Sequence, residues 1–347
     1  MSRVTANARK TWIGAVFFTM AALALAACGS TTAVIVVPHI NGTPSVSIDV
    51  ALQKIACTTA GTCIAVGADD SLVAPSAVGE VGHANATWSP ITLPSTLSQT
   101  VTAISCWSSQ CLIGGALPSS DSLWDYSPSD QSVSVATAPS GGRGVSALDC
   151  FAKAACAMVD GTGITGASRL SFTSDGSTWS TPLALAWTTG DAVTALSCSD
   201  DMNCLVAATN ARSRVLLEVT HDGGATWIVR PVPSTWTTLT SLDCSALDCV
   251  ALAGTASSPL LIRTGTNFRL FRSITLADNA SAIACARISR CVIAGQTSTR
   301  GPWLATLKGL KIHTLALKYV PTGLVDVACG VKSCAAIGAS TVLSFKP

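Results

Sequence analysis

The residues with the most evident chemistry are fifteen cysteines, of which fourteen form close pairs separated by four or five mostly polar or small residues. Thiols spaced in this way either bind a metal or form a disulfide. A structural zinc site needs four converging ligands, whereas these pairs recur at intervals of 41 to 49 residues and the four histidines occupy unrelated positions. We therefore expect no metal or other cofactor and seven local disulfides, which join Cys57 to Cys63, Cys106 to Cys111, Cys150 to Cys156, Cys198 to Cys204, Cys244 to Cys249, Cys285 to Cys291 and Cys329 to Cys334.

The elements that position these cysteines are repeated hairpins. Each first cysteine ends a β-type run such as VTAISC, and each second cysteine begins another, such as CLIGG. Opposed residues of an antiparallel hairpin have Cα atoms about 4.5–5.5 Å apart, which is within disulfide reach. A four-stranded propeller blade takes about 40–50 residues. The spacing therefore predicts an all-β fold, a seven-bladed β-propeller with one intra-blade disulfide hairpin per blade.

Two aspartates are candidates for catalysis. Asp149 and Asp243 stand at equivalent positions, one residue before the first cysteine of their repeats, where the other repeats have Ser or Ala. If both faced the propeller axis they would supply the two carboxylates, roughly 5–10 Å apart, that a glycosidase needs. The alternative is that each aspartate caps a turn or is solvated.

A second motif recurs later in the repeats, as THDGGATW at residues 220–227 and TSDGSTW at residues 173–179. It resembles the Asp-box, or bacterial neuraminidase repeat, which in that family forms the turn between the third and fourth strands of a blade. The resemblance implies structural roles: Asp175 and Asp222 accept backbone N–H groups in the turn, and Trp179 and Trp227 pack between blades.

The resemblance extends over residues from about 50 to 347. The chain resembles actinobacterial secreted repeat proteins with paired cysteines. In its Asp-box repeats it also resembles the photosystem II assembly factor family, which as a rule lacks those cysteines. Sialidases with Asp-boxes resemble one another in an arginine triad, a Tyr nucleophile with a Glu partner, and an acid/base Asp. This chain has two tyrosines, two glutamates and no spacing that marks a triad. We therefore do not expect sialidase activity.

The amino-terminal segment predicts export and lipid anchoring. Arg3, Arg9 and Lys10 precede an uncharged apolar stretch at residues 11–27, whose length suits a signal peptide better than a membrane span. The stretch ends in LAAC, which resembles the bacterial lipobox, so Cys28 is expected to be diacylated and to become the first residue. The alternative is an ordinary signal peptide with Cys28 as a free thiol.

The domain boundaries follow from these features. We expect residues 1–27 to be a signal peptide, residues 28–44 a lipid-anchored tether with a possible closing strand, and residues 45–347 the propeller. The last repeat lacks one strand, and either of two β-type runs, 33–37 or 45–50, can supply it. Such a strand joins the two ends of the chain and protects the sheet edge.

The remaining surface is polar and weakly charged. Without the three basic residues of the signal peptide, the chain has 18 basic and 19 acidic residues and no evident basic stripe, so we do not expect nucleic-acid binding. Trp107, Trp124 and Trp187 are candidates for a ligand face, with packing between blades as the alternative. We expect a monomeric binding or interaction module for a protein or glycan on the outer face of a bacterial membrane. The alternative is a carbohydrate-active hydrolase with an axial active site.

Overall fold

The part of the chain that the computed structural model describes consists of β-strands and their connections. It covers residues 35–36, 50–69, 76–83, 88–94, 101–115, 123–139, 144–161, 168–187, 190–245, 248–255, 258–265, 271–287, 289–315, 317, 323–338 and 341–345. Within it, no helix is long and apolar enough to cross a membrane. The predicted signal peptide and Cys28 lie outside the described residues.

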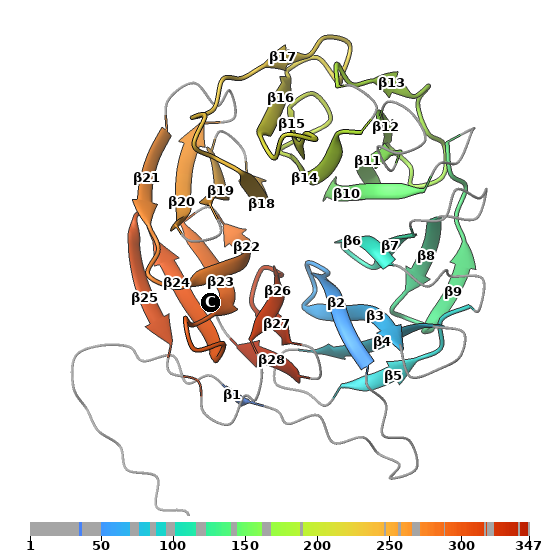
Figure 1. Cartoon of the computed structure of the whole chain (residues 1–347). Helices are drawn as coiled ribbons and strands as arrows, with labels where there is room; N and C mark the ends of the chain where they lie inside the picture. Colours follow the sequence, from blue (N-terminus) through green and yellow to red (C-terminus); the bar gives the residue numbers. More distant parts are fainter. Residues whose placement is uncertain are drawn as a thin grey trace, which may run out of the picture. The chain divides into compact units, whose positions relative to one another are not determined.

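Seven four-stranded antiparallel sheets, called blades here, follow one another around a central axis (Figure 1). Blade 1 contains β2 (Val50–Cys57), β3 (Thr62–Asp69), β4 (Ser76–His83) and β5 (Ser89–Ile91), and blade 2 contains β6 (Val101–Trp107), β7 (Gln110–Gly115), β8 (Leu123–Ser127) and β9 (Ser132–Val135). Blade 3 contains β10 (Val145–Ala152), β11 (Ala155–Asp160), β12 (Arg169–Thr173) and β13 (Leu183–Ala184). Blade 4 contains β14 (Ala192–Cys198), β15 (Cys204–Thr209), β16 (Val215–Thr220) and β17 (Ile228–Val229). Blade 5 contains β18 (Thr238–Ser245), β19 (Asp248–Thr255), β20 (Ser258–Gly265) and β21 (Phe271–Thr275). Blade 6 contains β22 (Asn279–Arg287), β23 (Arg290–Gln296), β24 (Pro302–Lys308) and β25 (Lys311–Leu315). Blade 7 contains β26 (Leu324–Cys329), β27 (Cys334–Gly338), β28 (Thr341–Phe345) and β1 (Ile35–Val36). The predicted fold class is confirmed.

Blade 7 takes its outer strand from the beginning of the chain. The short strand β1 pairs antiparallel with β28, so that Ile35 lies opposite Ser344 and Val36 opposite Leu343. The first of the two candidate runs, residues 33–37, therefore supplies the closing strand. Side chains also join the first and last blades, since Trp88 Nε1 donates a hydrogen bond to Ser344 Oγ at 3.3 Å.

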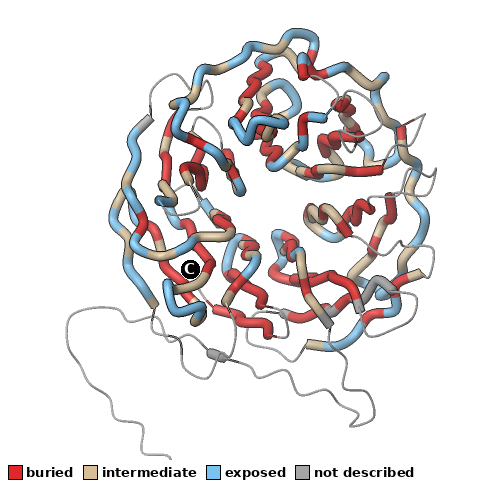
Figure 2. The backbone as a smooth tube through the Cα atoms, viewed as in Figure 1, coloured by how far each residue is buried: buried red, intermediate tan, exposed pale blue. Residues whose placement is uncertain are grey.

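The hydrophobic core is divided into layers between neighbouring blades. One such layer brings Val250 and Leu261 of blade 5 against Ile283, Ile293 and Trp303 of blade 6. The second strand of each blade lies inside its sheet and is covered by a neighbouring blade on both faces, which explains its continuous apolar runs. The outermost strands β9, β17 and β25 are mostly exposed (Figure 2).

All seven predicted disulfides are present, one in each blade. Each joins directly opposed residues of the first and second strands, whose Cα atoms are 3.9 to 4.1 Å apart. So short a separation marks the pairs that do not hydrogen bond to each other. The backbone N–H of each first cysteine therefore points away from the second strand and toward the axis.

Candidate binding face

One end of the propeller carries all the disulfide hairpins. Consecutive antiparallel strands place the turn between the first and second strands, and the turn between the third and fourth, at the same end of a sheet. We call this end the disulfide face. It includes the turns that resemble the Asp-box, between β12 and β13 and between β16 and β17.

The first strands enclose an axial cavity of about 380 Å³. Asp149 and Asp243 both line it, together with Ser105 and Ser197. The structure therefore brings the two candidate catalytic aspartates to one cavity. The lining that the described residues provide contains no Arg, Lys or His, which are the groups that would bind an anionic substrate.

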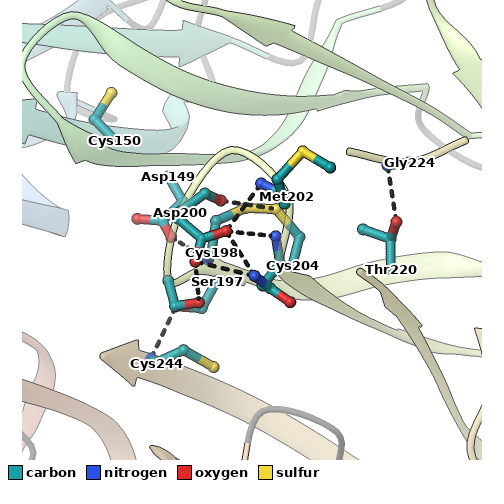
Figure 3. The surroundings of a disulfide bond; sticks show 12 residues. Asp149, Cys150, Ser197, Cys198, Asp200, Met202, Cys204, Thr220, Gly224 and Cys244 are labelled. Atoms are coloured by element: carbon teal, nitrogen blue, oxygen red, sulfur yellow. Dashed lines mark hydrogen bonds between the residues drawn. A yellow bond between two sulfur atoms is a disulfide. The ribbon is translucent and has the colours of Figure 1, made fainter. Parts of the chain in front are cut away.

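Side chains at the position before the first cysteine hydrogen bond to the next blade. Asp149 is the clearest example (Figure 3), since its carboxylate reaches the backbone of blade 4. The equivalent Ser or Asp does the same at three other boundaries. The acceptor-to-nitrogen distances are 2.9 Å from Ser105 to Cys150, 2.6 Å from Asp149 to Cys198, 3.0 Å from Ser197 to Cys244 and 2.9 Å from Asp243 to Cys285.

These contacts have a physical reason. The first strand of a blade is an edge strand, and its outward N–H groups lack a partner in their own sheet. The Ser or Asp of the preceding blade supplies the acceptor. Between blades 7 and 1 Asp326 has a similar role, since its Oδ2 accepts the N–H of Ile55 at 3.1 Å. The aspartates at these positions therefore join blades.

Burial changes the ionisation of these carboxyls. It raises the pKa of Asp149 to about 6, although the hydrogen bond from Cys198 favours the charged form. Burial raises the pKa of Asp243 to about 7, and the negative charge of Asp149 adds to the shift. The pKa of Asp326 is also raised by burial, against the attraction of Lys54. Asp149 and Asp243, which line the axial cavity, therefore have pKa values closer to neutral pH than an ordinary aspartate.

The turn at residues 220–227 is held by one carboxylate. Asp222 Oδ1 accepts the backbone N–H of Thr226 at 2.9 Å and the hydroxyl of Thr220 at 2.8 Å. The Thr226 hydroxyl, which donates to Oδ2 at 2.6 Å, and that backbone N–H keep the pKa of Asp222 below its usual value. Gly224 has a φ of +86° in this turn, a conformation that side chains disfavour.

The turn at residues 173–179 has the same construction. Asp175 Oδ1 accepts the backbone N–H groups of Thr178 and Ser177 at 2.6 and 2.8 Å, and these bonds lower the pKa of Asp175. The partly buried Trp179 packs in the layer between blades 2 and 3, and Trp227 in the layer between blades 3 and 4. These four residues shape and support the disulfide face.

Charges on the disulfide face are segregated between two groups of blades. Among the described residues, blades 2 to 4 contribute mostly acidic side chains there, namely Asp125, Asp130, Asp175, Asp200, Asp201 and Asp222 against Lys153. Blades 5 to 7 contribute mostly basic ones, namely Arg263, Arg272, Arg287, Arg290, Lys308, Lys311 and Lys332 against Asp243 and Asp248. The near-zero total charge is thus divided between two regions of opposite sign.

The tryptophans proposed as a ligand face are buried. Trp124 is 0% exposed, Trp107 4% and Trp187 7%. Trp107 lies against the turn of the next blade, where a Cβ added to Gly176 would come within 3.4 Å of its ring. The prediction of exposed tryptophans is therefore corrected in favour of its alternative, packing between blades.

Trp187 also borders a cavity of about 440 Å³ at the opposite end of the propeller. Asp191, Arg212 and Glu218 line the same cavity. Burial raises the pKa of Glu218, although its Oε2 accepts the backbone N–H of Ala186 at 3.3 Å. Within the described part of the chain, no three His, Cys, Asp or Glu side chains converge in a way that would hold a metal ion.

Comparisons with known proteins define the fold and no more. No family model matches the sequence, and no curated protein matches it either. A solved structure described as YCF48 bound to D1 peptide is similar with a TM-score of 0.62 and 14% identity, over 90% of this chain and 98% of that chain. YCF48 from Cyanidioschyzon merolae gives a TM-score of 0.61 and 10% identity, over 87% and 97%. A catalytically inactive virginiamycin B lyase from Staphylococcus aureus, with quinupristin, gives a TM-score of 0.63 and 8% identity, over 91% of this chain and 98% of that chain.

These neighbours differ in what they do. One is described with a bound peptide and another is a lyase. At such identities the likeness establishes the β-propeller fold, and the function has to be argued from this chain's own residues.

Proposed function

We propose that the chain is an extracytoplasmic binding module that docks a partner protein on its disulfide face. In this proposal the lipid at Cys28 holds the propeller on the bacterial membrane, because acyl chains on one residue give stable anchoring. The turns at residues 173–179 and 220–227 are assigned to the Asp-box class on their shared Thr–Asp–Gly–Trp pattern and hydrogen bonding.

The observation that supports docking is the segregation of charge on a stiff surface. On this face the hairpin between the first and second strands of each blade is closed by a disulfide, so these hairpins lose little conformational entropy when a partner binds. Acidic groups on blades 2 to 4 and basic groups on blades 5 to 7 give the face a fixed electrostatic direction. Such a pattern sets the orientation of a partner and speeds its association.

A photo-crosslinking experiment tests this proposal. A benzophenone amino acid replaces the exposed Met202 on the disulfide face or, as a control, the exposed Arg212 at the opposite end. The variants are expressed in the source bacterium and irradiated in intact cells. We expect a discrete protein adduct from position 202 and none from position 212. Adducts from position 212 alone, or from neither position, would contradict the proposal.

The alternative is a carbohydrate-active hydrolase at the axial cavity. It is favoured by the raised pKa of both Asp149 and Asp243 beside one cavity, since such pairs occur at catalytic sites. The hydrogen bonds from Cys198 and Cys285 weigh against it because each carboxylate already joins two blades. Hydrolysis of fluorogenic glycosides that disappears in Asp149→Asn and Asp243→Asn would support the hydrolase instead.

A further inference from the structure

A cleft of about 810 Å³ lies where blades 5 and 6 meet on the disulfide face. Four basic side chains line it, from the ends of strands β20, β21, β24 and β25: Arg263, Arg272, Lys308 and Lys311. Asp248 is the one acidic residue among the described residues of the lining, and it is bound to Arg263 with 3.1 Å between Oδ2 and Nη2. The cleft therefore has an excess of positive charge.

The basic residues stand in two pairs of like charge. Arg263 lies directly opposite Arg272 on neighbouring strands, and Lys308 lies directly opposite Lys311. Directly opposed like charges destabilise a sheet. Burial in a core does not explain these pairs, since Arg272, Lys308 and Lys311 are exposed. An anion between the members of each pair would remove the repulsion.

The excess extends along the sequence around the cleft. Residues 249–325 contain nine Lys and Arg residues and a single acidic residue, Asp278. That acidic residue follows β21 and lies near the opposite end of blade 5. Within the described lining, Asp248 offsets one of the four positive charges, and Asp278 lies too far from the cleft to offset another.

We infer that the cleft binds a ligand carrying two or more phosphate groups. A phosphate monoester has a charge of about −1.5 to −2 and three acceptor oxygens, so one such group matches one pair of opposed cations. A carboxylate, with a single charge, neutralises only half of the pair of Lys308 and Lys311, since Asp248, the one acidic residue of the described lining, is bound to Arg263. Arginine also binds phosphate through two parallel hydrogen bonds. The inference rests on the proposed function, because it names the ligand class of one part of the docking face.

Calorimetric titration of the purified mature protein with inorganic tripolyphosphate tests the inference. We expect saturable binding that the double variant Arg272→Gln with Lys311→Gln weakens about 100-fold, because two charge-assisted hydrogen-bonding groups are lost. The matched control, Arg212→Gln with Arg214→Gln, removes two exposed charges at the opposite end and should change the affinity less than about twofold. Equal losses in both double variants, or no saturable binding, would overturn the inference.

Two further arms identify the chemistry and its source. Poly-glutamate that binds more tightly than tripolyphosphate would overturn the preference for phosphate. Phosphatidic acid vesicles that bind through Arg272 and Lys311 would support phosphate recognition at a lipid surface, and binding of tripolyphosphate alone would support a free ligand. If tripolyphosphate does not bind but position 202 still forms crosslinks in cells, only the phosphate site is overturned. If tripolyphosphate binds but position 202 forms no crosslinks, only the docking of a partner protein is overturned.

Discussion

The carboxylate of Asp149 accepts the backbone N–H of Cys198 across the boundary between blades 3 and 4, with 2.6 Å between Oδ2 and N. The contact links the side chain of Asp149 in blade 3 to the first cysteine of the disulfide of blade 4. The hydrogen bond between blades and the disulfide within a blade therefore stabilise the same strand. Asp149, which the sequence suggested as a catalytic residue, thus has a structural role. Its replacement should therefore change the free energy of unfolding.

The variant Asp149→Ala should be less stable than the variant Asp149→Asn, because both lack the buried charge but only Asn keeps an acceptor. The N–H of Cys198 loses its acceptor, and a hydrogen bond of this kind contributes about 1–2 kcal/mol to the free energy of unfolding. Asp149→Asn keeps a carbonyl oxygen that can accept the same N–H and carries no buried charge, so at pH 7 it should be at least as stable as the native protein. Urea unfolding measures both variants. Equal stability of the two variants would contradict a role for the acceptor.

A serine introduced at position 56 should stabilise the boundary between blades 1 and 2. Ala56 occupies the position that Ser105 and Ser197 hold in other blades, and it also lines the axial cavity. A hydroxyl there is placed to accept the N–H of Cys106, and a new hydrogen bond adds about 0.5–1.5 kcal/mol. The matched variant is Ser105→Ala, which removes the equivalent hydrogen bond between blades 2 and 3 and should lower the free energy of unfolding by a similar amount. An Ala56→Ser variant with an unchanged urea midpoint would contradict the inter-blade account.

Stability should rise as the pH falls from 7 toward 4. The folded-state pKa values of Asp149 and Asp243, about 6 and about 7, exceed the ordinary aspartate value. The folded protein therefore binds protons in this window that the unfolded chain does not. This stabilisation is complete below the unfolded pKa and is lost as the pH rises through the folded values. Below about pH 4 the lowered pKa values of Asp175 and Asp222 act in the opposite direction.

Urea midpoints between pH 4 and 8 measure this dependence, with the double variant Asp149→Asn, Asp243→Asn as the control. The variant should lose most of the slope between pH 4 and 7, because asparagine does not titrate. A slope that persists unchanged would assign the effect to other groups.

Cys28 should carry the membrane anchor. In bacteria labelled with radioactive palmitate, the native chain should incorporate label and sediment with membranes. The Cys28→Ala variant should do neither, because no other thiol precedes the first disulfide of the propeller. A labelled variant, or an unlabelled native chain that still sediments, would contradict lipid attachment at this residue.

The fold was predictable because its evidence is local in sequence. The cysteine of each first strand and its partner are only five or six residues apart, and seven copies of one pattern leave few alternatives. The choice of closing strand was not predictable, since residues 33–37 and 45–50 are both β-type runs and only the pairing of β1 with β28 distinguishes them.

The candidate site was less predictable because it depends on contacts between repeats. The sequence placed Asp149 and Asp243 at equivalent positions, but their hydrogen bonds are to residues 49 and 42 positions away. The basic cleft joins two blades, and a total charge near zero concealed it. One signal was available: nine of the chain's basic residues stand with a single acidic residue between positions 249 and 325.

Peptide mapping of the oxidised mature protein by mass spectrometry, without reduction, tests the arrangement on which the disulfide face depends. The account predicts seven bridges, each between the two cysteines of one blade, as in the pair Cys198 and Cys204, with Cys28 in none of them. A bridge between cysteines of different blades would contradict it.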